Sequence, residues 1–184
     1  MGFRFEKKLP SLLFYPTVGV HTMTSIGVIG IIITVIGASM IFATYMYYEY
    51  QPNFILVEAG QPVQIGPVIY TVEHIGMHEG DDDITPDAIF FKIQIIAENV
   101  GLTTTLLSGG QFYLLDENDN KYRAVYGEFD NEDLYNDDLK PNESITRTTQ
   151  FDIPFDDDMK YKIAILPTKE QSSKDIGIIC VMNC

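Results

Sequence analysis

Hydrophobic and polar residues are distributed in two different ways along this chain of 184 residues. No charged residue occurs from Thr22 to Tyr48, and Ile26–Tyr48 is almost continuously apolar. A helix of that length rises about 34 Å, enough to cross the hydrocarbon core of a bilayer, which is roughly 30 Å thick. Tyrosines, whose amphipathic rings prefer the membrane boundary, gather at one end of the run: Tyr45, Tyr47, Tyr48 and Tyr50. The pattern predicts a single transmembrane helix over residues 25–48.

A cleaved signal peptide and a buried core helix are the alternatives to a membrane span. The apolar region of a signal peptide is normally about 7–15 residues long and is followed by a cleavage site with small residues. The run in this chain is longer, begins only at Ile26, and no A-x-A-like sequence follows it. We therefore expect the helix to stay in the mature protein.

Beyond the apolar run, apolar and polar residues alternate in short segments. In the clearest segment, Ile89–Asn99, the side chains of Phe91, Ile93 and Ile95 point one way and that of Lys92 the other. A period of two is typical of a strand with one buried face. Eight strands are predicted in this way: Phe54–Glu58, Val68–Ile75, Ile89–Asn99, Gln111–Asp116, Lys121–Val125, Ser144–Ile153, Tyr161–Leu166 and Ile176–Val181.

Turn residues separate these segments, and no stretch after residue 50 shows a convincing helical period. Turns are predicted at Asn99–Gly101, Ser108–Gly110, Asp116–Asn120 and Lys140–Glu143. Short strands with frequent turns and no internal repeat are typical of an antiparallel β-sandwich. The chain is therefore predicted to be mainly β: an antiparallel immunoglobulin-like β-sandwich over residues 49–184, preceded by the transmembrane α-helix.

Charge is divided unequally between the two parts. The chain has 26 acidic and 12 basic residues, a net charge of −14. Residues 1–48 carry three basic residues and one acidic residue (3 − 1 = +2), and residues 49–184 carry 9 basic and 25 acidic residues (9 − 25 = −16). A domain this acidic is repelled by phosphate backbones, so nucleic-acid binding is excluded, whereas cationic partners are compatible with it.

The basic residues also predict the orientation of the helix. Arg4, Lys7 and Lys8 precede the apolar run, and the next basic residue is Lys92. Because basic flanks favour the cytoplasmic side, we expect residues 1–24 to form a cytoplasmic or interfacial segment. The protein is then a single-pass protein of the cell membrane, with its N-terminus in the cytoplasm and its C-terminal domain outside.

Three motifs of the predicted sandwich occur in a fixed order. A long alternating strand ends in Asn99-Val-Gly101, the hairpin sequence FYLLDENDNKY follows, and LKPNESITRTTQFDIP comes next. Over roughly residues 56–182 the chain thereby resembles the telokin-like immunoglobulin-fold domains of unknown function of bacterial and archaeal cell surfaces. The resemblance implies a fold and a location and says little about activity. Asn120 and Asn142 stand where such domains often have Gly, and both can adopt the positive φ of a turn.

Histidines and carboxylates at the end of one predicted strand form the best candidate metal site. His74 and His78 are followed by Glu79 and Asp81, ligand types that suit zinc or copper. Histidines at i and i+4 converge on a helix, however, and this stretch is predicted to be a strand end and a loop. A solvated, pH-responsive loop is therefore the alternative interpretation of His74, His78 and Asp81.

No other motif indicates catalysis. The sequence contains no Gly-rich phosphate loop, H-E-x-x-H or G-x-S-x-G element. The third histidine, His21, lies on the other side of the predicted span. We therefore expect a protein that is not an enzyme and binds no cofactor.

Clustered carboxylates predict at most weak binding of divalent cations. The stretch Asp116–Asn120 resembles the start of a calcium loop, but Lys121 and Gly127 stand where an EF-hand needs Gly and Glu. A hairpin turn rich in Asx side chains explains it. A looser calcium site and a solvated surface are the alternatives for the other clustered residues: Asp130, Asp133, Asp137, Asp138 and Asp156–Asp158.

Three further residues are candidates for covalent modification. Asn142-Glu-Ser144 is the one N-x-S/T sequon, which makes Asn142 a glycosylation candidate in a predicted turn. Cys180 and Cys184 would lie about 13 Å apart in an extended chain, beyond disulfide reach unless the tail folds back. We expect Cys180 to be a small buried hydrophobic residue and Cys184 to be able to cross-link two chains.

Small residues on the predicted helix favour close packing against another helix, as in G-x-x-x-G pairs. They recur near one face: Gly27, Gly30, Thr34, Gly37 and Ala38. The expected partner is a second protein or another copy of the chain, bound through the helix and the sandwich.

Taken together, these patterns predict a non-enzymatic, membrane-anchored protein of the cell envelope whose acidic β-sandwich binds another protein, as an accessory subunit of a membrane or surface complex. Two alternatives remain. One is an extracellular metal-handling or redox protein that uses His74 and His78. The other is a stator-like component of an archaellum or pilus.

Overall fold

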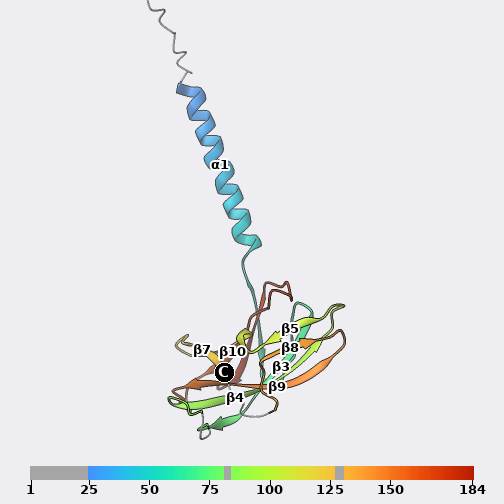
Figure 1. Ribbon diagram of the computed structural model, residues 1–184. Coiled ribbons are helices and arrows are strands. Elements are labelled where there is room, and N and C mark those ends of the chain that lie inside the picture. The colour runs from blue at the N-terminus through green and yellow to red at the C-terminus, as the bar shows by residue number, and fades with distance from the viewer. Residues whose placement is uncertain (1–24, 81–83, 127–130) are drawn as a thin grey trace, which may run out of the picture. The chain divides into compact units, whose positions relative to one another are not determined.

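The computed structural model describes residues 25–80, 84–126 and 131–184 (Figure 1). The contacts within the chain divide it between Glu49 and Tyr50 into two units. The first contains one helix and the second contains every strand of the described residues. Each unit is described by itself below.

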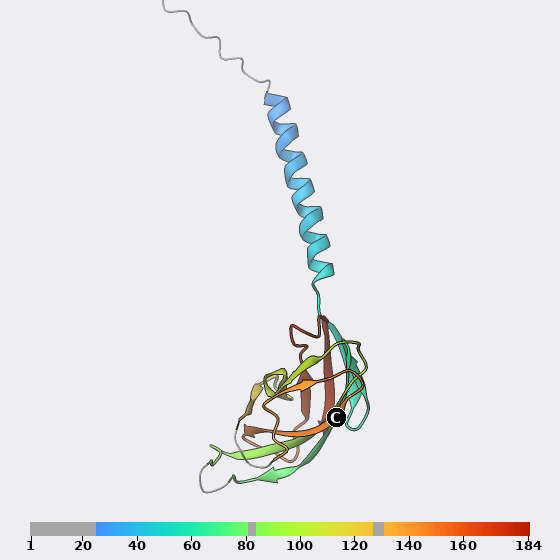
Figure 2. The same ribbon diagram turned by 45° about the vertical axis from the view of Figure 1, so that its right-hand side comes forward.

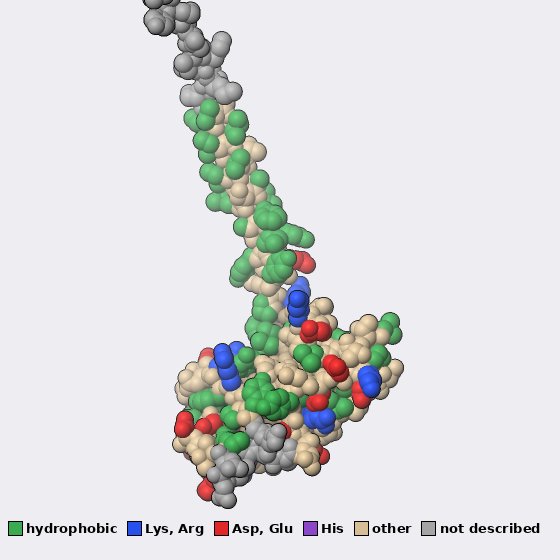
Figure 3. All heavy atoms as spheres, viewed as in Figure 1, with side chains coloured by type: hydrophobic (Ala, Val, Ile, Leu, Met, Phe, Trp, Pro, Cys, Tyr) green, Lys and Arg blue, Asp and Glu red, His purple; other side chains and the backbone are tan. Residues whose placement is uncertain are grey.

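Helix α1 spans Ser25–Glu49, and its segment Gly27–Glu49 has a mean hydropathy of 2.2 over its most apolar part. Its hydroxyl groups donate to carbonyls one turn earlier: Thr34 to Gly30 (2.9 Å), Ser39 to Val35 (2.8 Å) and Thr44 to Met40 (2.8 Å). These three hydroxyl groups are thus satisfied within the helix. The helix is long and apolar enough to cross a membrane, and most of its large apolar side chains between Val28 and Tyr48 are exposed (Figure 3).

Eleven strands are described in the second unit: β1 Asn53–Glu58, β2 Val63–Ile65, β3 Val68–His78, β4 Ile89–Asn99, β5 Thr105–Ser108, β6 Phe112–Asp116, β7 Lys121–Val125, β8 Asn136–Leu139, β9 Ser144–Ile153, β10 Tyr161–Ile165 and β11 Asp175–Met182. The eight predicted strands are all present. The sequence analysis missed β2, β5 and β8, which are three or four residues long and too short to show a period. A single turn of 3₁₀ helix, η1, spans Gly109–Gln111.

Nine of these strands form one sheet in the order β1-β11-β10-β6-β7-β9-β4-β3-β2, and β5 and β8 form a separate ladder. Strand β7 pairs with β6 through Tyr113↔Arg123 and with β9 through Ala124↔Phe151, so the sheet folds at β7 into two layers. The layers approach closely where β11 faces β2, because a side-chain carbon at Gly177 would lie 3.0 Å from Cδ1 of Ile65. The predicted β-sandwich with one N-terminal helix is confirmed.

One pair of strands departs from the antiparallel prediction. Strands β1 and β11 run parallel, from Asn53↔Asp175 to Glu58↔Cys180 (Figure 2). The two are far apart in sequence and no hairpin joins them, so nothing in their connection requires opposite directions.

The core lies between the two layers and follows the predicted phase of β4. Phe91, Ile93, Ile95 and Ala97 are fully buried, whereas Ile96 on the opposite face is 41% exposed. Phe91 contacts aromatic rings from other strands, among them Tyr161, whose centroid lies 5.6 Å away. Burial of these alternating residues therefore joins β4 to the opposite layer.

Substituting Phe91 by Ala should lower the free energy of unfolding by about 3–5 kcal/mol, because it removes a fully buried ring and leaves a cavity. Urea unfolding of the full chain in detergent, followed by near-UV circular dichroism, measures this change.

The matched control is Ile96→Ala on the same strand, which should cost about 0.5 kcal/mol because the side chain is half exposed. Equal losses for the two variants would contradict the assigned faces of β4.

Candidate functional site

The outer surface of one layer carries a continuous set of apolar and cationic side chains. Cross-strand pairing places Leu56, Ile178, Ala164, Tyr113 and Arg123 in one row across five strands. A second row runs Glu58, Cys180, Lys162, Leu115 and Lys121. With Phe54 and Ile176, which pair with each other at the edge, these residues are called the cationic face below.

This face differs in charge from the rest of the domain. Its two rows hold three cations, Lys121, Arg123 and Lys162, and one carboxylate, Glu58, a balance of 3 − 1 = +2. The sum for residues 49–184 is −16 (9 basic, 25 acidic). The Nζ atom of Lys121 lies 3.7 Å from the ring centroid of Tyr113, a cation–π contact. The surface therefore offers an anionic group both charge and aromatic area.

Strand β1 contributes two large, exposed apolar side chains to the cationic face. Phe54 is 57% exposed and Leu56 is 71% exposed, although both are large and apolar. A depression of about 390 Å³ lies beside them, lined among others by Leu56, Ile178, Lys162 and the two cysteines. Large apolar side chains grouped at a surface are typical of interaction sites.

A disulfide bond joins Cys180 to Cys184, with their Cα atoms 5.9 Å apart. The expectation of an unpaired, buried Cys180 and a Cys184 free to link two chains is therefore wrong. The tail reverses at Asn183, whose φ is 57°, so the distance of an extended chain does not apply. The Asn183 side chain stabilises this reversal by donating to the carbonyls of Asp157 (2.6 Å) and Met159 (3.1 Å).

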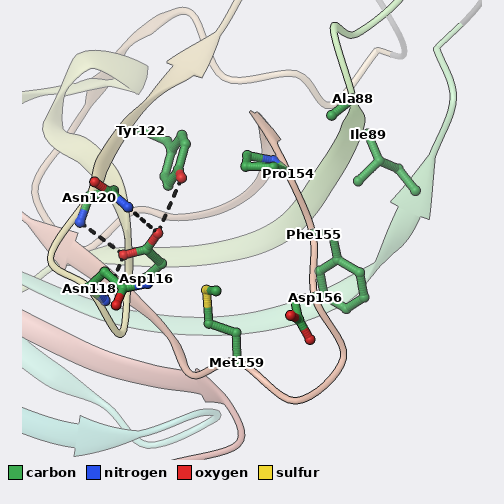
Figure 4. A pocket seen from close by; sticks show the side chains of 10 residues that line it. All are labelled: Ala88, Ile89, Asp116, Asn118, Asn120, Tyr122, Pro154, Phe155, Asp156 and Met159. Atoms are coloured by element: carbon green, nitrogen blue, oxygen red, sulfur yellow. Dashed lines mark hydrogen bonds between the residues drawn. The ribbon is translucent and has the colours of Figure 1, made fainter.

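Asp116 borders a second, open depression of about 600 Å³ (Figure 4). Its carboxylate accepts hydrogen bonds from the backbone N–H groups of Asn118 and Asn120 (both 2.9 Å) and from the Asn120 side chain (2.8 Å). The Tyr122 hydroxyl donates a fourth at 3.2 Å. Burial raises the pKa of Asp116, but these four hydrogen bonds outweigh it, and the pKa lies below its ordinary value.

The stretch that resembles a calcium loop is thus a hairpin, and its first carboxylate, that of Asp116, accepts hydrogen bonds from the turn itself. The positive φ of this hairpin falls on Asp119 (62°) and not on Asn120, which corrects the sequence prediction. At the other predicted position the expectation is confirmed, since Asn142 has a φ of 61°.

A β-bulge separates the two candidate metal-binding histidines. The register of β3 with β4 shifts between His74 and Gly76, so that His74 pairs with Ile93 and His78 with Phe90. Ile93 faces the core and Phe90 points to the other side of the strand, so the two imidazoles lie on opposite faces of the sheet. The structure does not bring them together.

Each imidazole instead contacts a different phenylalanine ring and a different backbone group. The ring of His74 stacks on Phe91 with centroids 4.0 Å apart, and its Nε2 lies 3.0 Å from the carbonyl oxygen of Gly76. Burial lowers the pKa of His74, and the Gly76 contact opposes this shift in part. His78 lies against Phe90 and accepts the N–H of Gly80 at Nδ1 (3.2 Å). Asp81 is outside the described residues.

Three of the other candidate carboxylates also have protein partners. Asp137 forms an ion pair with Arg147 (2.8 Å), Asp133 accepts the Thr148 hydroxyl (3.1 Å), and Asp156 accepts the N–H of Asp158 (3.0 Å). Asp130 is outside the described residues. Among residues 25–80, 84–126 and 131–184, no group of three or more His, Cys, Asp or Glu is placed to hold a metal ion.

Two further predictions concern exposed positions. Asn142 lies at the tip of the turn between β8 and β9, where Glu143 N–H donates to the Lys140 carbonyl (3.1 Å), and its side chain is exposed. On α1, a side-chain carbon at Gly27, Gly30 or Gly37 would meet no atom within 4 Å, and Thr34 and Ala38 are exposed. Glycosylation of Asn142 and helix pairing remain predictions.

A buried polar network was missed by the sequence analysis. The side-chain amide of Gln171 donates to the Tyr70 hydroxyl (2.6 Å), and the Gln111 amide donates to the oxygen of Gln171 (3.1 Å) and to the Leu166 carbonyl (2.9 Å). Burial raises the pKa of Tyr70 to about 12, against the lowering effect of the two glutamines. The signal of this network in the sequence was weak, because the sequence around a buried glutamine in a loop does not differ from that around a solvated one. The network holds the loops around η1 and before β11.

Comparison with known proteins shows what the domain resembles. A family model described as a domain of unknown function (DUF4352) matches residues 57–175. No curated protein matches the sequence.

Solved structures of similar fold include the yjhA protein of Bacillus subtilis, with 17% identity and a TM-score of 0.52 over 67% of this chain and 98% of that one. A candidate lipoprotein of B. subtilis, ycdA, has 14% identity and a TM-score of 0.55 over 67% of this chain, which spans only 39% of ycdA. The secreted protein MPT63 of Mycobacterium tuberculosis has 11% identity and a TM-score of 0.51 over 67% of this chain and 95% of that one.

Replacing Asp116 by Asn should destabilise the domain by about 1.5–3 kcal/mol at pH 7, because the amide nitrogen cannot accept the hydrogen bonds of the turn. The pKa of Asp116 is lowered in the folded state, so its stabilisation is complete above the ordinary pKa of 3.8 and is lost as the pH falls through the folded-state value. The difference between wild type and variant should therefore shrink below about pH 4. Urea unfolding from pH 2 to pH 7 measures it.

Asp119→Asn is the control in the same hairpin, because Asn tolerates the positive φ and the Asp119 side chain is exposed. A similar, pH-dependent loss in this control would show that general charge, and not the Asp116 hydrogen bonds, is responsible.

Proposed function

This chain belongs to the family of the domain of unknown function DUF4352, and from that premise we propose that it is a membrane-anchored, non-enzymatic interaction protein of the cell envelope. In this proposal α1 spans the membrane, the β-sandwich lies outside, and the telokin-like immunoglobulin topology serves as a scaffold for binding another protein. The observation that carries it is the combination, in one chain, of an exposed apolar helix long enough to cross a membrane and a disulfide-bonded β-domain.

The helix supports the anchor. Gly27–Glu49 has 23 residues and rises about 34 Å, close to the thickness of a hydrocarbon core. Its large apolar side chains are exposed, among them Ile41 and Phe42. Such a surface is stable in lipid and not in water. The positive flank Arg4, Lys7 and Lys8 favours a cytoplasmic N-terminus.

The disulfide supports the outer location of the sandwich. Cytoplasmic thiols are kept reduced, whereas a bond such as Cys180–Cys184 persists in an oxidising compartment. The secreted and lipoprotein-like descriptions of structures with this fold agree with a surface location for the fold.

The chemistry of the buried polar groups supports a non-enzymatic role. The Asp116 carboxylate, the Gln111 and Gln171 amides and the Asn99 amide all bind backbone groups, some in their own turn and some in another part of the chain; Asn99, for example, donates to the carbonyls of Thr103 and Leu139 (both 2.8 Å). A catalytic group must be available to a substrate, and these groups are instead bound to the backbone. The cationic face is instead accessible, and it is where we expect protein contact.

Two variants with one added cysteine each test the orientation in intact cells. Leu102→Cys places a thiol on the most exposed of the large apolar side chains of the described domain, 95% exposed, and Ser11→Cys places one before the helix. A membrane-impermeant maleimide should label Leu102→Cys in intact cells and Ser11→Cys only after lysis. The native cysteines should react only after reduction.

Labelling of Ser11→Cys from outside, or of Leu102→Cys only after lysis, would refute the orientation. Recovery of the Leu102→Cys domain in the soluble fraction, without its first fifty residues, would refute the anchor. Wild-type protein is the control for reaction of the native cysteines.

A further inference from the structure

The two edge strands of the nine-stranded sheet, β2 and β1, differ in how well they are protected from pairing with another molecule. At one end β2 has only three residues, and β3 continues beyond it with a bulge after His74 and a φ of 135° at Gly76. Short edge strands and bulges prevent a sheet from pairing with another molecule. This edge is therefore protected.

The edge formed by β1 has none of these features. Its six residues, Asn53–Glu58, contain no Pro, Lys or Arg and pair with β11 without a shift in register. The N–H of Asn53 donates to the Lys174 carbonyl (3.1 Å), so the alternate residues Ile55 and Val57 also turn their backbone groups toward β11.

The backbone groups of Phe54 and Leu56 consequently point away from β11. Among the described residues no strand pairs along that side, because β1 ends the strand order of the sheet. The side chains of both residues are exposed on the cationic face. An exposed apolar edge strand is a template for pairing with another strand.

We propose that a second copy of this chain occupies this edge, with the two β1 strands antiparallel about a twofold axis through Ile55. In this register Phe54 lies opposite the partner's Leu56, and Leu56 lies opposite the partner's Phe54. All four residues direct N–H and C=O groups across the edge, so the pair forms four backbone hydrogen bonds. The self-complementary contact extends two nine-stranded sheets into one.

The charge of β1 favours a second copy over other occupants. Every residue from Tyr50 to Val57 is uncharged, in a part of the chain whose net charge is −16. In the stated register Glu58 lies opposite the partner's Pro52, so the two Glu58 carboxylates stand at opposite ends of the contact. Two acidic domains can therefore meet here without opposing like charges.

Two paired strands bury less than the roughly 1,200 Å² of a stable interface, so the contact needs support. The proposal rests on the membrane anchor, because two chains held in one membrane meet at a high effective concentration. Only Tyr50–Pro52 separate α1 from β1 in the sequence. Association of the helices through Gly27 and Gly30 would further favour the strand contact.

A cysteine scan of β1 in the full chain, in native membranes, tests the register. Residue 55 of one copy faces residue 55 of the other in a pair without mutual hydrogen bonds, about 4.5 Å between Cα atoms and within disulfide reach. With Asn53→Cys or Val57→Cys, equal positions lie about 14 Å apart. Oxidation should therefore give about fivefold more covalent dimer for Ile55→Cys than for either neighbour.

Variants of Leu56 in the Ile55→Cys background test the hydrogen bonds. Leu56→Pro removes an outward N–H and no bond to β11, and Leu56→Lys adds a charge at the edge, so each should reduce the covalent dimer to the level of Asn53→Cys. Leu102→Lys is the matched control, an exposed leucine away from the edge, and should leave the dimer unchanged.

Equal cross-linking at positions 53, 55 and 57, or cross-linking of Gly30→Cys with none at position 55, would overturn the proposal. Leu102→Cys, labelled from outside in parallel, reports the orientation independently. Absent cross-linking with normal labelling refutes the strand pairing alone, whereas absent labelling refutes the proposed function. Unchanged near-UV circular dichroism of the Leu56 variants shows that they fold.

Discussion

Backbone hydrogen bonding governs the design of this domain, because a sheet that does not close on itself ends in two strands with one unpaired side. The sheet folds at β7 into two layers, so that one face of each layer is buried against the other. Strands β1 and β2 remain at the two ends of the sheet. The edge strand β2 has only three residues, whereas the edge strand β1 has six residues with regular pairing. The open backbone groups at β1 are thus the part of the domain best suited to contact another molecule.

Long alternating segments could be predicted from the sequence, because their period of two follows directly from burial of one face. The predicted bounds Ile89–Asn99 are those of β4, and its inward residues are buried. Features that depend on a single residue could not be found in this way. The bulge after His74 reverses the phase of β3, and the positive φ of Asn183 turns the tail back onto β11. The first separates the two histidines and the second brings the two cysteines together.

The structure shows where the acidic and basic side chains lie, which the composition does not. Asp116 and Asp156 each accept N–H groups within their own turns, so part of the negative charge stabilises local backbone conformation. Lys121, Arg123 and Lys162 share one face with exposed apolar side chains. Composition gives only the net charge of the domain, whereas cross-strand register separates a cationic face from acidic loops.

The parallel pairing of β1 with β11 also affects how the domain is made. Asn53 and its partner Asp175 are 122 residues apart, so β1 leaves the ribosome long before the strand that covers its inner side. Contacts of such high order form slowly, because a long loop must be closed before they stabilise anything. Until β11 has been synthesised, the apolar segment Phe54–Val57 therefore has no strand paired on either side, and it is open to pairing with other nascent chains.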